Sequence, residues 1–172
     1  KKIKHVNFSY KNLVIGLECG GSDTTSGLIA NPCLGLFVDD LIKKKGSAIF
    51  SEPVECLGGE ESLLKRIKRK KLKLKLLNTI YKYQNIAKDN KINLTGINPT
   101  PDNIRGGLST IEEKSLGAIS KSGSKNIIDI IEFGKKIKKN GLNLLDAPAA
   151  AVENLTALSA AGCQIILFTT GG

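Results

Sequence analysis

The stretch that decides the fold is Val14-Ile15-Gly16-Leu17-Glu18-Cys19-Gly20-Gly21-Ser22-Asp23, close to the start of the chain. A short apolar run leads into a glycine pair and a polar turn, and a helical pattern follows. In α/β proteins the mouth of such a strand is where ligands are usually bound, because free backbone N–H groups and a helix N-terminus meet there. The stretch therefore predicts the first strand of a sheet with a site at its end.

Short apolar runs alternate with helical patterns along the rest of the chain. We expect strands at 13–17, 48–50, 142–145 and 164–169, a brief strand at 95–97, a strand or short helix at 127–133, and helices at 27–45, 60–89 and 152–161. This alternation predicts an α/β fold with a mostly parallel, Rossmann-like sheet flanked by helices.

Helix starts and loops follow from local residue types. Asn31-Pro32 is suited to the cap and first turn of the helix at 27–45. Ser109 or Thr110 is suited to cap a helix that opens at Ile111, and Ser109-x-x-Glu112 has the pattern of a capping box. The stretch 98–110 is rich in Pro and Gly, so we expect it to be irregular, and 117–124 is loop-like.

Length and composition are those of one globular domain. The 172 residues are 41% hydrophobic and 24% charged, which is enough for a core of its own. We expect a polar leader or linker at 1–12 and an α/β catalytic-type domain at 13–172. No apolar run approaches ~18 residues, so no membrane span is expected. Because the chain has no methionine and stops directly after an apolar run, we expect it to be part of a larger protein.

The net charge of +10 comes largely from the run Lys65–Lys75. Leucines and isoleucines keep helical spacing through this run, which places the lysines on a solvated helix face. No aromatic side chains are interleaved with them to stack on bases, so the pattern argues against a nucleic-acid partner.

The four cysteines form no C-x-x-C pair, which argues against a zinc ribbon. Free thiols fit the cytoplasm. Cys33, Cys56 and Cys163 stand among apolar or small neighbours, where small buried hydrophobic residues are expected.

Polar residues follow three of the predicted strands: Cys19 to Asp23, Ser51-Glu52 with Glu55, and Asp146 to Pro148. Parallel strands would gather these ends at one edge of the sheet. Cys19 has two functional interpretations, a thiolate nucleophile or a ligand for a soft or borderline metal such as iron, beside a buried cysteine at a strand end.

Other side chains have both a functional and a structural interpretation. Gly20 and Gly21 would let the backbone approach a ligand, or simply form a turn. Arg105 and Lys114 would bind a substrate carboxylate, or lie on the surface. The carboxylates are candidate acids, bases or metal ligands, or alternatively helix caps and solvated charges: Asp23, Glu52, Glu55, Glu112 and Glu113.

Two enzyme classes have no support in the sequence. His5 is the only histidine and lies in the leader, so serine-hydrolase chemistry with a histidine is not expected. No Walker-type loop is present and no G-x-G-x-x-G follows the first strand, so nucleotide binding has no positive indication.

Several motifs in one order resemble the altronate/galactarate dehydratase family, which includes a sulfolactate sulfo-lyase branch. They cover nearly the whole chain from Leu13 onward. The matching residues are Gly16 to Asp23, Ser26-Gly27, Ala30-Asn31-Pro32, Ser51-Glu52 with Glu55, Asn98-Pro99-x-Pro101-x-Asn103, Gly106-Gly107-Leu108, Thr110 to Gly117, Ala161 to Gln164, and Phe168 to Gly171.

The chain departs from the family pattern at three places. Asp102 stands where glycine is usual, Ala149-Ala150-Ala151 replaces a loop that contains Gly and Asp, and Cys33 stands where alanine is common. The alanine run puts in doubt whatever that loop contributes.

The resemblance implies a metal-dependent lyase that acts on hydroxy acids. Its full-length members carry an additional N-terminal domain, so this chain would be the C-terminal catalytic portion, and we expect a homo-oligomer. The metal would be Fe²⁺, or else Mn²⁺ or Mg²⁺, stabilising an enolate-like intermediate. The expected reaction is dehydration of altronate or galactarate to a 2-keto-3-deoxy acid, with sulfolactate cleavage, or a non-catalytic subunit that binds an acidic partner, as alternatives.

Each candidate residue then has an expected role. We expect Cys19, Asp23, Glu52 and Glu112 to be catalytic and Cys19 and Glu55 to bind the metal. The residues expected to bind substrate are Gly20, Gly21, Ser22, Asn98, Arg105 and Lys114.

Overall fold

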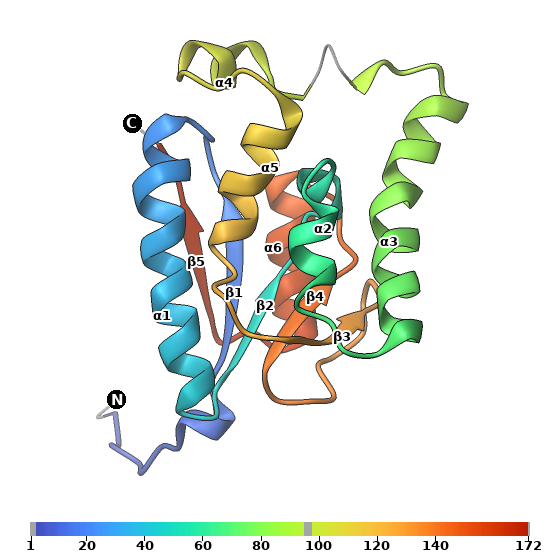
Figure 1. Ribbon diagram of the computed structural model, residues 1–172. Helices are drawn as coiled ribbons and strands as arrows, with labels where there is room; N and C mark the ends of the chain where they lie inside the picture. Colours follow the sequence, from blue (N-terminus) through green and yellow to red (C-terminus); the bar gives the residue numbers. More distant parts are fainter. Residues whose placement is uncertain (1–2, 95–97, 172) are drawn as a thin grey trace.

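Figure 1 shows the computed structural model of the chain, which describes residues 3–94 and 98–171. The brief strand expected at 95–97 lies outside the described residues. The polar start of the chain is exposed and contains one turn of 3₁₀-helix, Tyr10–Asn12. None of the described helices is long and apolar enough to cross a membrane.

Five parallel strands form the centre of the molecule. They are β1 (Val14–Cys19), β2 (Ser47–Phe50), β3 (Ile127–Ile131), β4 (Leu142–Leu145) and β5 (Ile165–Thr169), in the order β3-β4-β2-β1-β5. This arrangement confirms the predicted α/β fold with a parallel sheet. It also places the carboxyl ends of all five strands at one edge. β1 lies between β2 and an outermost strand, β5.

Helices cover both faces of the sheet (Figure 1). On one face lie the π-helical turn η2 (Ser26–Ala30), α1 (Asn31–Lys43), α2 (Glu60–Leu64), α3 (Lys70–Asp89) and α5 (Ile111–Ser120), while α6 (Ala151–Ala161) lies on the other. Side chains alternate between the two faces along each strand. Ala48 and Phe50 belong to the larger apolar cluster, which includes side chains of α1 and α3, whereas Ile49 belongs to the cluster that includes Leu158 of α6.

The single long helix expected at 60–89 is wrong, because the chain leaves helical geometry between α2 and α3. Arg69 is extended, with φ −86° and ψ 123°. The guanidinium of Arg66 donates to the hydroxyl and carbonyl of Ser122 and to the carbonyl of Lys125, and the Arg66 carbonyl accepts from Ile127. These contacts with the start of β3 outweigh local helix propensity, which is a weak preference.

The Pro/Gly-rich stretch is more regular than expected. Thr100 and Asn103 form a capping box that starts the short helix α4 (Pro101–Arg105). Of the two caps expected for α5, Thr110 is confirmed, because its hydroxyl accepts from the Glu113 N–H. The capping box expected at Ser109 and Glu112 is wrong by one residue, because the carboxylate that accepts from the Ser109 N–H and hydroxyl is that of Glu113.

The segment from 117 onward, expected as a loop, instead belongs to α5 as far as Ser120. Asn31 does not cap α1, because the chain is already helical through η2. Its side chain instead donates to the Gly117 carbonyl and accepts from Thr169.

The helix expected at 27–45 is confirmed by η2 and α1, and the segment at 127–133 is a strand. A short 3₁₀-helix, η3 (Pro53–Cys56), follows β2. Of the three cysteines expected to be buried, Cys56 is buried and Cys163 is half-buried. Cys33 is exposed on α1, so that expectation is wrong.

Candidate active site

The carboxyl edge of the sheet brings together side chains from three segments of the chain. Glu18 and Cys19 end β1, Glu52 follows β2, and Lys121 follows α5. Because Leu17 pairs with Phe50 in the parallel register, the residues after these two positions emerge side by side. The fold therefore places the predicted residues Cys19 and Glu52 next to each other.

Lys121 is the centre of this group. Its side chain is only 2% exposed, and its Nζ lies 2.7 Å from Cys19 Sγ and 2.5 Å from Glu52 Oε2. The same carboxylate oxygen accepts from the Cys19 backbone N–H at 3.1 Å. Glu52 is buried as well, so the ion pair is shielded from water.

Glu52 is held in a backbone conformation that costs energy. Its φ of 62° and ψ of 58° are left-handed, a region that non-glycine residues seldom occupy. Such strain persists only where the surrounding structure enforces it, and it is concentrated at functional sites. Here Lys121 and the Cys19 N–H fix the carboxylate on one side, and η3 begins on the other.

The buried environment changes the pKa of both Cys19 and Lys121. Desolvation raises the pKa of Cys19 to about 11, although the Lys121 ammonium opposes the rise. At neutral pH this group is a thiol, so its environment does not favour the thiolate nucleophile. Burial disfavours the Lys121 ammonium, but its contacts with Cys19 and Glu52 outweigh this effect and raise the pKa of Lys121.

Glu18 is a second buried carboxyl group at this edge, and it is completely inaccessible to solvent. Burial first, and then the charge of Glu52, raise the pKa of Glu18 to about 8. Its Oε2 accepts a hydrogen bond from the Asn154 amide of α6. Its Oε1 has no hydrogen-bond partner among the described residues, and the raised pKa favours the protonated carboxylic acid at neutral pH.

A second polar group continues from Glu52 through η3. The Lys114 ammonium lies 3.2 Å from both Glu55 carboxylate oxygens and donates to Asn98 Oδ1 at 2.6 Å. Burial raises the pKa of Glu55, while Lys114 acts in the opposite direction. The structure therefore brings together three more of the predicted site residues: Asn98, Lys114 and Glu55.

A cavity of about 530 Å³ opens beside this second group. Its lining includes Asn98, the exposed Glu112 of the first α5 turn, Tyr81 and Gln84. Gly58 makes the close approach to Glu112 possible: its φ is +83°, and a Cβ there would lie 2.8 Å from the Glu112 side chain. Of the predicted catalytic carboxylates, Glu112 is the one that lines this cavity.

The predicted glycine pair is engaged within the protein. The Gly20 N–H donates to the Thr169 carbonyl at 2.6 Å, and the Gly21 N–H donates to Thr170 Oγ1 at 3.2 Å. The Ser22 carbonyl accepts from the Asn103 amide. These contacts join the turn after β1 to the end of β5 and to α4.

Asp23 and Arg105 have structural partners of their own. Asp23 Oδ1 accepts from the Ser26 N–H at 2.7 Å and from the Thr25 hydroxyl, so it caps the helical segment that leads into η2. Arg105 pairs with Asp102 on exposed α4.

The two side chains expected to bind a metal, Cys19 and Glu55, are each in contact with a lysine ammonium. Lys121 contacts Cys19 and Glu52, and Lys114 contacts Glu55, so an ammonium holds each place where a cation would bind. Within 3–94 and 98–171, no group of three or more His, Cys, Asp or Glu side chains is placed to hold a metal ion. The side chains described here therefore do not fit a divalent metal on their own.

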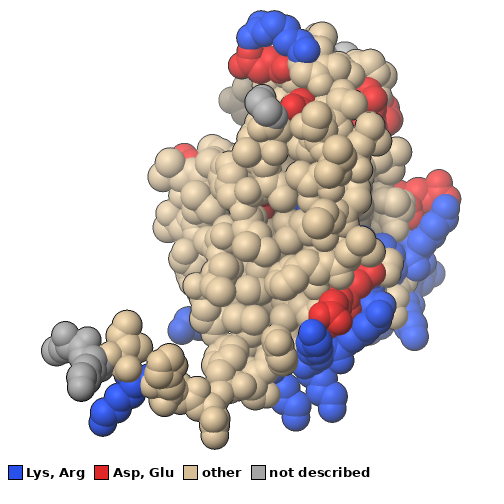
Figure 2. Space-filling model, turned by 90° about the vertical axis from the view of Figure 1, so that its left-hand side faces the viewer, with Lys and Arg blue, Asp and Glu red and all other residues tan. Residues whose placement is uncertain are grey.

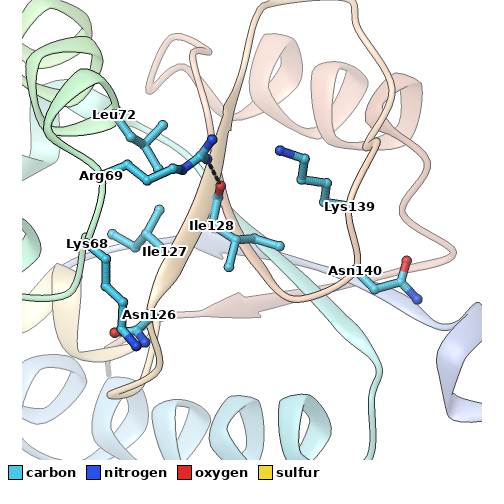
Figure 3. Close-up of a pocket in the computed structure, with 8 residues that line it drawn as sticks. All are labelled: Lys68, Arg69, Leu72, Asn126, Ile127, Ile128, Lys139 and Asn140. Atoms are coloured by element: carbon cyan, nitrogen blue, oxygen red, sulfur yellow. Dashed lines mark hydrogen bonds between the residues drawn. The ribbon is translucent and has the colours of Figure 1, made fainter.

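Another hollow lies at the opposite, amino edge of the sheet, between the start of α3 and the starts of β3 and β4. It has a volume of about 440 Å³, and Lys68, Arg69 and Lys139 line it (Figure 3). No carboxylate lines it, and none of the predicted site residues does.

Two residues of this site, Lys121 and Glu18, are not among the site residues predicted from the sequence. Lys121 is one of 26 cationic residues and has no distinguishing motif. Glu18 carried a usable indication, because it is the only charged residue inside the apolar run of β1. A carboxylate in a central parallel strand has to be buried, and a buried carboxylate needs a specific environment.

A parallel α/β domain with buried, mutually compensating acids and lysines at the carboxyl edge of its sheet has the features of an enzyme domain. Sequence comparison gives the particular family. Residues 10–172 match the family described as D-galactarate/Altronate dehydratase, C-terminal, and the chain belongs to it.

The curated relatives are lyases. The chain is 42% identical over 170 residues to the altronate dehydratase of Bacillus subtilis (strain 168), which covers 98% of this chain and 34% of the relative. It is 35% identical to the galactarate dehydratase (L-threo-forming) of Escherichia coli (strain K12), covering 92% and 30%. It is 34% identical to the (2R)-sulfolactate sulfo-lyase subunit beta of Chromohalobacter salexigens, covering 92% and 41%. The chain thus spans about a third of the length of these relatives.

Proposed function

We propose that this chain is the catalytic portion of a hydro-lyase that dehydrates a sugar acid of the altronate or galactarate type to a 2-keto-3-deoxy acid. The observation that carries the proposal is the buried group of Glu18, Cys19, Glu52 and Lys121, at the carboxyl edge of a parallel sheet in a chain of this family. Groups that are costly to bury are typical of sites where proton transfer is tuned.

Dehydration needs a base that removes the proton next to the substrate carboxylate and an acid that protonates the leaving hydroxyl. The raised pKa of Glu18 favours its protonated form at neutral pH, but Glu18 is inaccessible to solvent, so we assign it a positioning role beside Glu52, held by Asn154, and not the acid that touches substrate. Glu112 is suited to contact substrate in the cavity, and Asn98 is suited to hold a substrate hydroxyl or carboxylate there. Lys121 is a positioning residue that fixes Cys19 and Glu52.

A divalent metal, Fe²⁺ or else Mn²⁺ or Mg²⁺, is part of the proposal as a Lewis acid for the substrate. Since lysines occupy Cys19 and Glu55, such a metal would require ligands from outside the described residues. More than half of each relative's length lies outside the match, which supports a further domain or subunit as their source. We also propose that the enzyme is a homo-oligomer and acts in the cytoplasm.

The sulfo-lyase alternative is supported by the similarity to the sulfolactate sulfo-lyase subunit beta. Expulsion of sulfite instead of a hydroxyl would use the same removal of a proton next to a carboxylate. The two functions differ in the leaving group, so product analysis distinguishes them.

The test exchanges this chain for the matched segment of the Bacillus subtilis altronate dehydratase and assays 2-keto-acid formation from altronate and galactarate, and sulfite release from (2R)-sulfolactate. Cys19→Ser is expected to lower kcat/KM at least tenfold while far-UV circular dichroism stays unchanged, because it alters the contact with Lys121. Cys33→Ser, at the exposed thiol, is the matched control. Absence of turnover on all three acids would contradict the proposal and favour a non-catalytic subunit.

A further inference from the structure

The side of the molecule formed by η2, α1 and β5 is apolar and exposed. We call it the α1–β5 face and define it by Leu28, Ile29, Leu36, Phe37, Ile165 and Phe168. Leu36 is 74% exposed and Leu28 73%. Figure 2 looks onto this side and shows a broad surface without Lys or Arg at its centre, with the charged side chains gathered at its rim. Large exposed apolar patches with a polar rim mark interaction surfaces.

The edge of the sheet on this face is open. β5 pairs with β1 on one side and has no second strand beside it among the described residues. Native edge strands are normally protected by lysine, proline, a bulge or a covering element. β5 has the sequence Ile-Ile-Leu-Phe-Thr and a regular register with β1, so it has no such protection of its own.

A hollow of about 320 Å³ adjoins the face between η2 and α5. Leu28, Leu108 and Leu116 line it, together with two glycines, Thr24 and Glu113. Its size and lining suit an apolar side chain of a neighbouring segment. Figure 2 shows Lys and Arg at the rim of this face and not at its centre, so a partner would be recognised there by apolar contact and strand pairing rather than by charge.

We propose that the α1–β5 face is covered by the part of the dehydratase that this chain does not span, with one of its strands added beside β5 and its apolar side chains packed on α1. The inference goes beyond the proposed reaction and identifies where the rest of the enzyme docks. Its basis is that the matched segment is 30–41% of the length of the relatives, so more than half of each relative lies outside it and is available to cover this face.

This position would also bring the covering part to the candidate active site. Thr169 at the end of β5 donates to Asn31 Oδ1 and lies 3.2 Å from the Glu18 carbonyl. A strand added parallel to β5 would therefore end at the same edge of the sheet, separated from Glu18 and Cys19 only by β5. There it would be placed to supply the groups that the described residues lack.

The test measures association instead of turnover. The Bacillus subtilis altronate dehydratase is expressed without its matched segment, and its binding to this 172-residue chain is followed by sedimentation velocity and titration. Leu36→Lys and Ile165→Lys are each expected to weaken binding at least tenfold, because each places a charge in an apolar contact. Leu74→Lys, at a leucine 55% exposed on α3, is the matched control and should stay within twofold.

Hydrogen exchange gives a second readout, because strand addition should slow exchange of β5 amides at least tenfold in the complex. The proposal is wrong if the unsubstituted chain sediments alone, or if Leu36→Lys and Leu74→Lys bind equally well. It is also wrong if the chain instead forms a dimer that Leu36→Lys and Ile165→Lys dissociate, since a second copy would then be the occupant. Binding without turnover would support this docking surface and contradict only the proposed reaction.

Discussion

The two edges of the same parallel sheet hold positive charge in opposite ways. At the carboxyl edge, Lys121 is buried and in contact with Cys19 and Glu52. At the amino edge, the exposed side chains of Lys68 and Lys139 surround an open hollow without any carboxylate in its lining (Figure 3). The cationic side chains at the amino-edge hollow are exposed to solvent, whereas the charges at the carboxyl edge are desolvated. Burial of charge, not the presence of a hollow, distinguishes the candidate active site.

The largest difference between the edges should appear when a lysine loses its charge. Lys121→Met removes the ammonium and leaves the buried Glu52 without its ion-pair partner, which is expected to lower the free energy of unfolding by about 3–5 kcal/mol. Lys139→Met at the amino edge is the matched control and should change it by less than about 0.5 kcal/mol. Urea unfolding of the two variants gives both values. A loss below about 1 kcal/mol in Lys121→Met would show that the carboxyl edge is not organised around this ion pair.

A pH-dependent effect of intermediate size is expected at Glu18. Its pKa in the folded chain is raised to about 8, above the ordinary value of 4.5. Between these two pH values the unfolded chain loses the proton while the folded chain keeps it, so stability falls as pH rises through this window and then levels off above pH 8. Below pH 4.5 both states are protonated and the penalty is absent.

Glu18→Gln removes this titration while it retains the shape of the side chain. The variant should therefore be more stable than the parent at pH 8.5 by on the order of 1–3 kcal/mol, and the gain should shrink toward pH 5. Urea unfolding at several pH values measures the gain. A gain that is independent of pH would mean that the carboxyl group of Glu18 does not titrate within this window.

Four of the five strands could be predicted from local patterns, because each is a short apolar run bounded by turn residues, whereas the pattern at 127–133 fits a strand or a short helix equally. The same patterns placed Cys19 and Glu52 at one edge, since parallel strands align their carboxyl ends. The break between α2 and α3 could not be predicted, because Arg66 leaves the helix for partners 56 and 59 residues away.

Lys121 shows why the candidate site could be predicted only in part from the sequence. It meets Cys19 across 102 residues and Glu52 across 69, and neither its neighbours nor its spacing distinguishes it from the other lysines. Conversely, Asp23 is a predicted catalytic residue with a helix cap as the alternative, and its carboxylate accepts from Ser26 and Thr25 in the next turn. Residue type and motif indicate which groups are able to act, but only the fold decides which of them lie together.

The smallest expected effect is at Arg69, a side chain of the amino-edge hollow that is hydrogen-bonded to β3. Its Nη2 donates to the Ile128 carbonyl of β3 at 2.6 Å, although the side chain is exposed. Arg69→Met removes this hydrogen bond but leaves the carbonyl open to water, so we expect a loss of about 0.5–1 kcal/mol in the free energy of unfolding. Lys68→Met, the neighbouring cation in the same lining, should cost less than Arg69→Met in parallel urea titrations. If Arg69→Met instead approached the loss expected for Lys121→Met, the amino edge would have to be regarded as a second organised polar site, and the contrast between the edges would fail.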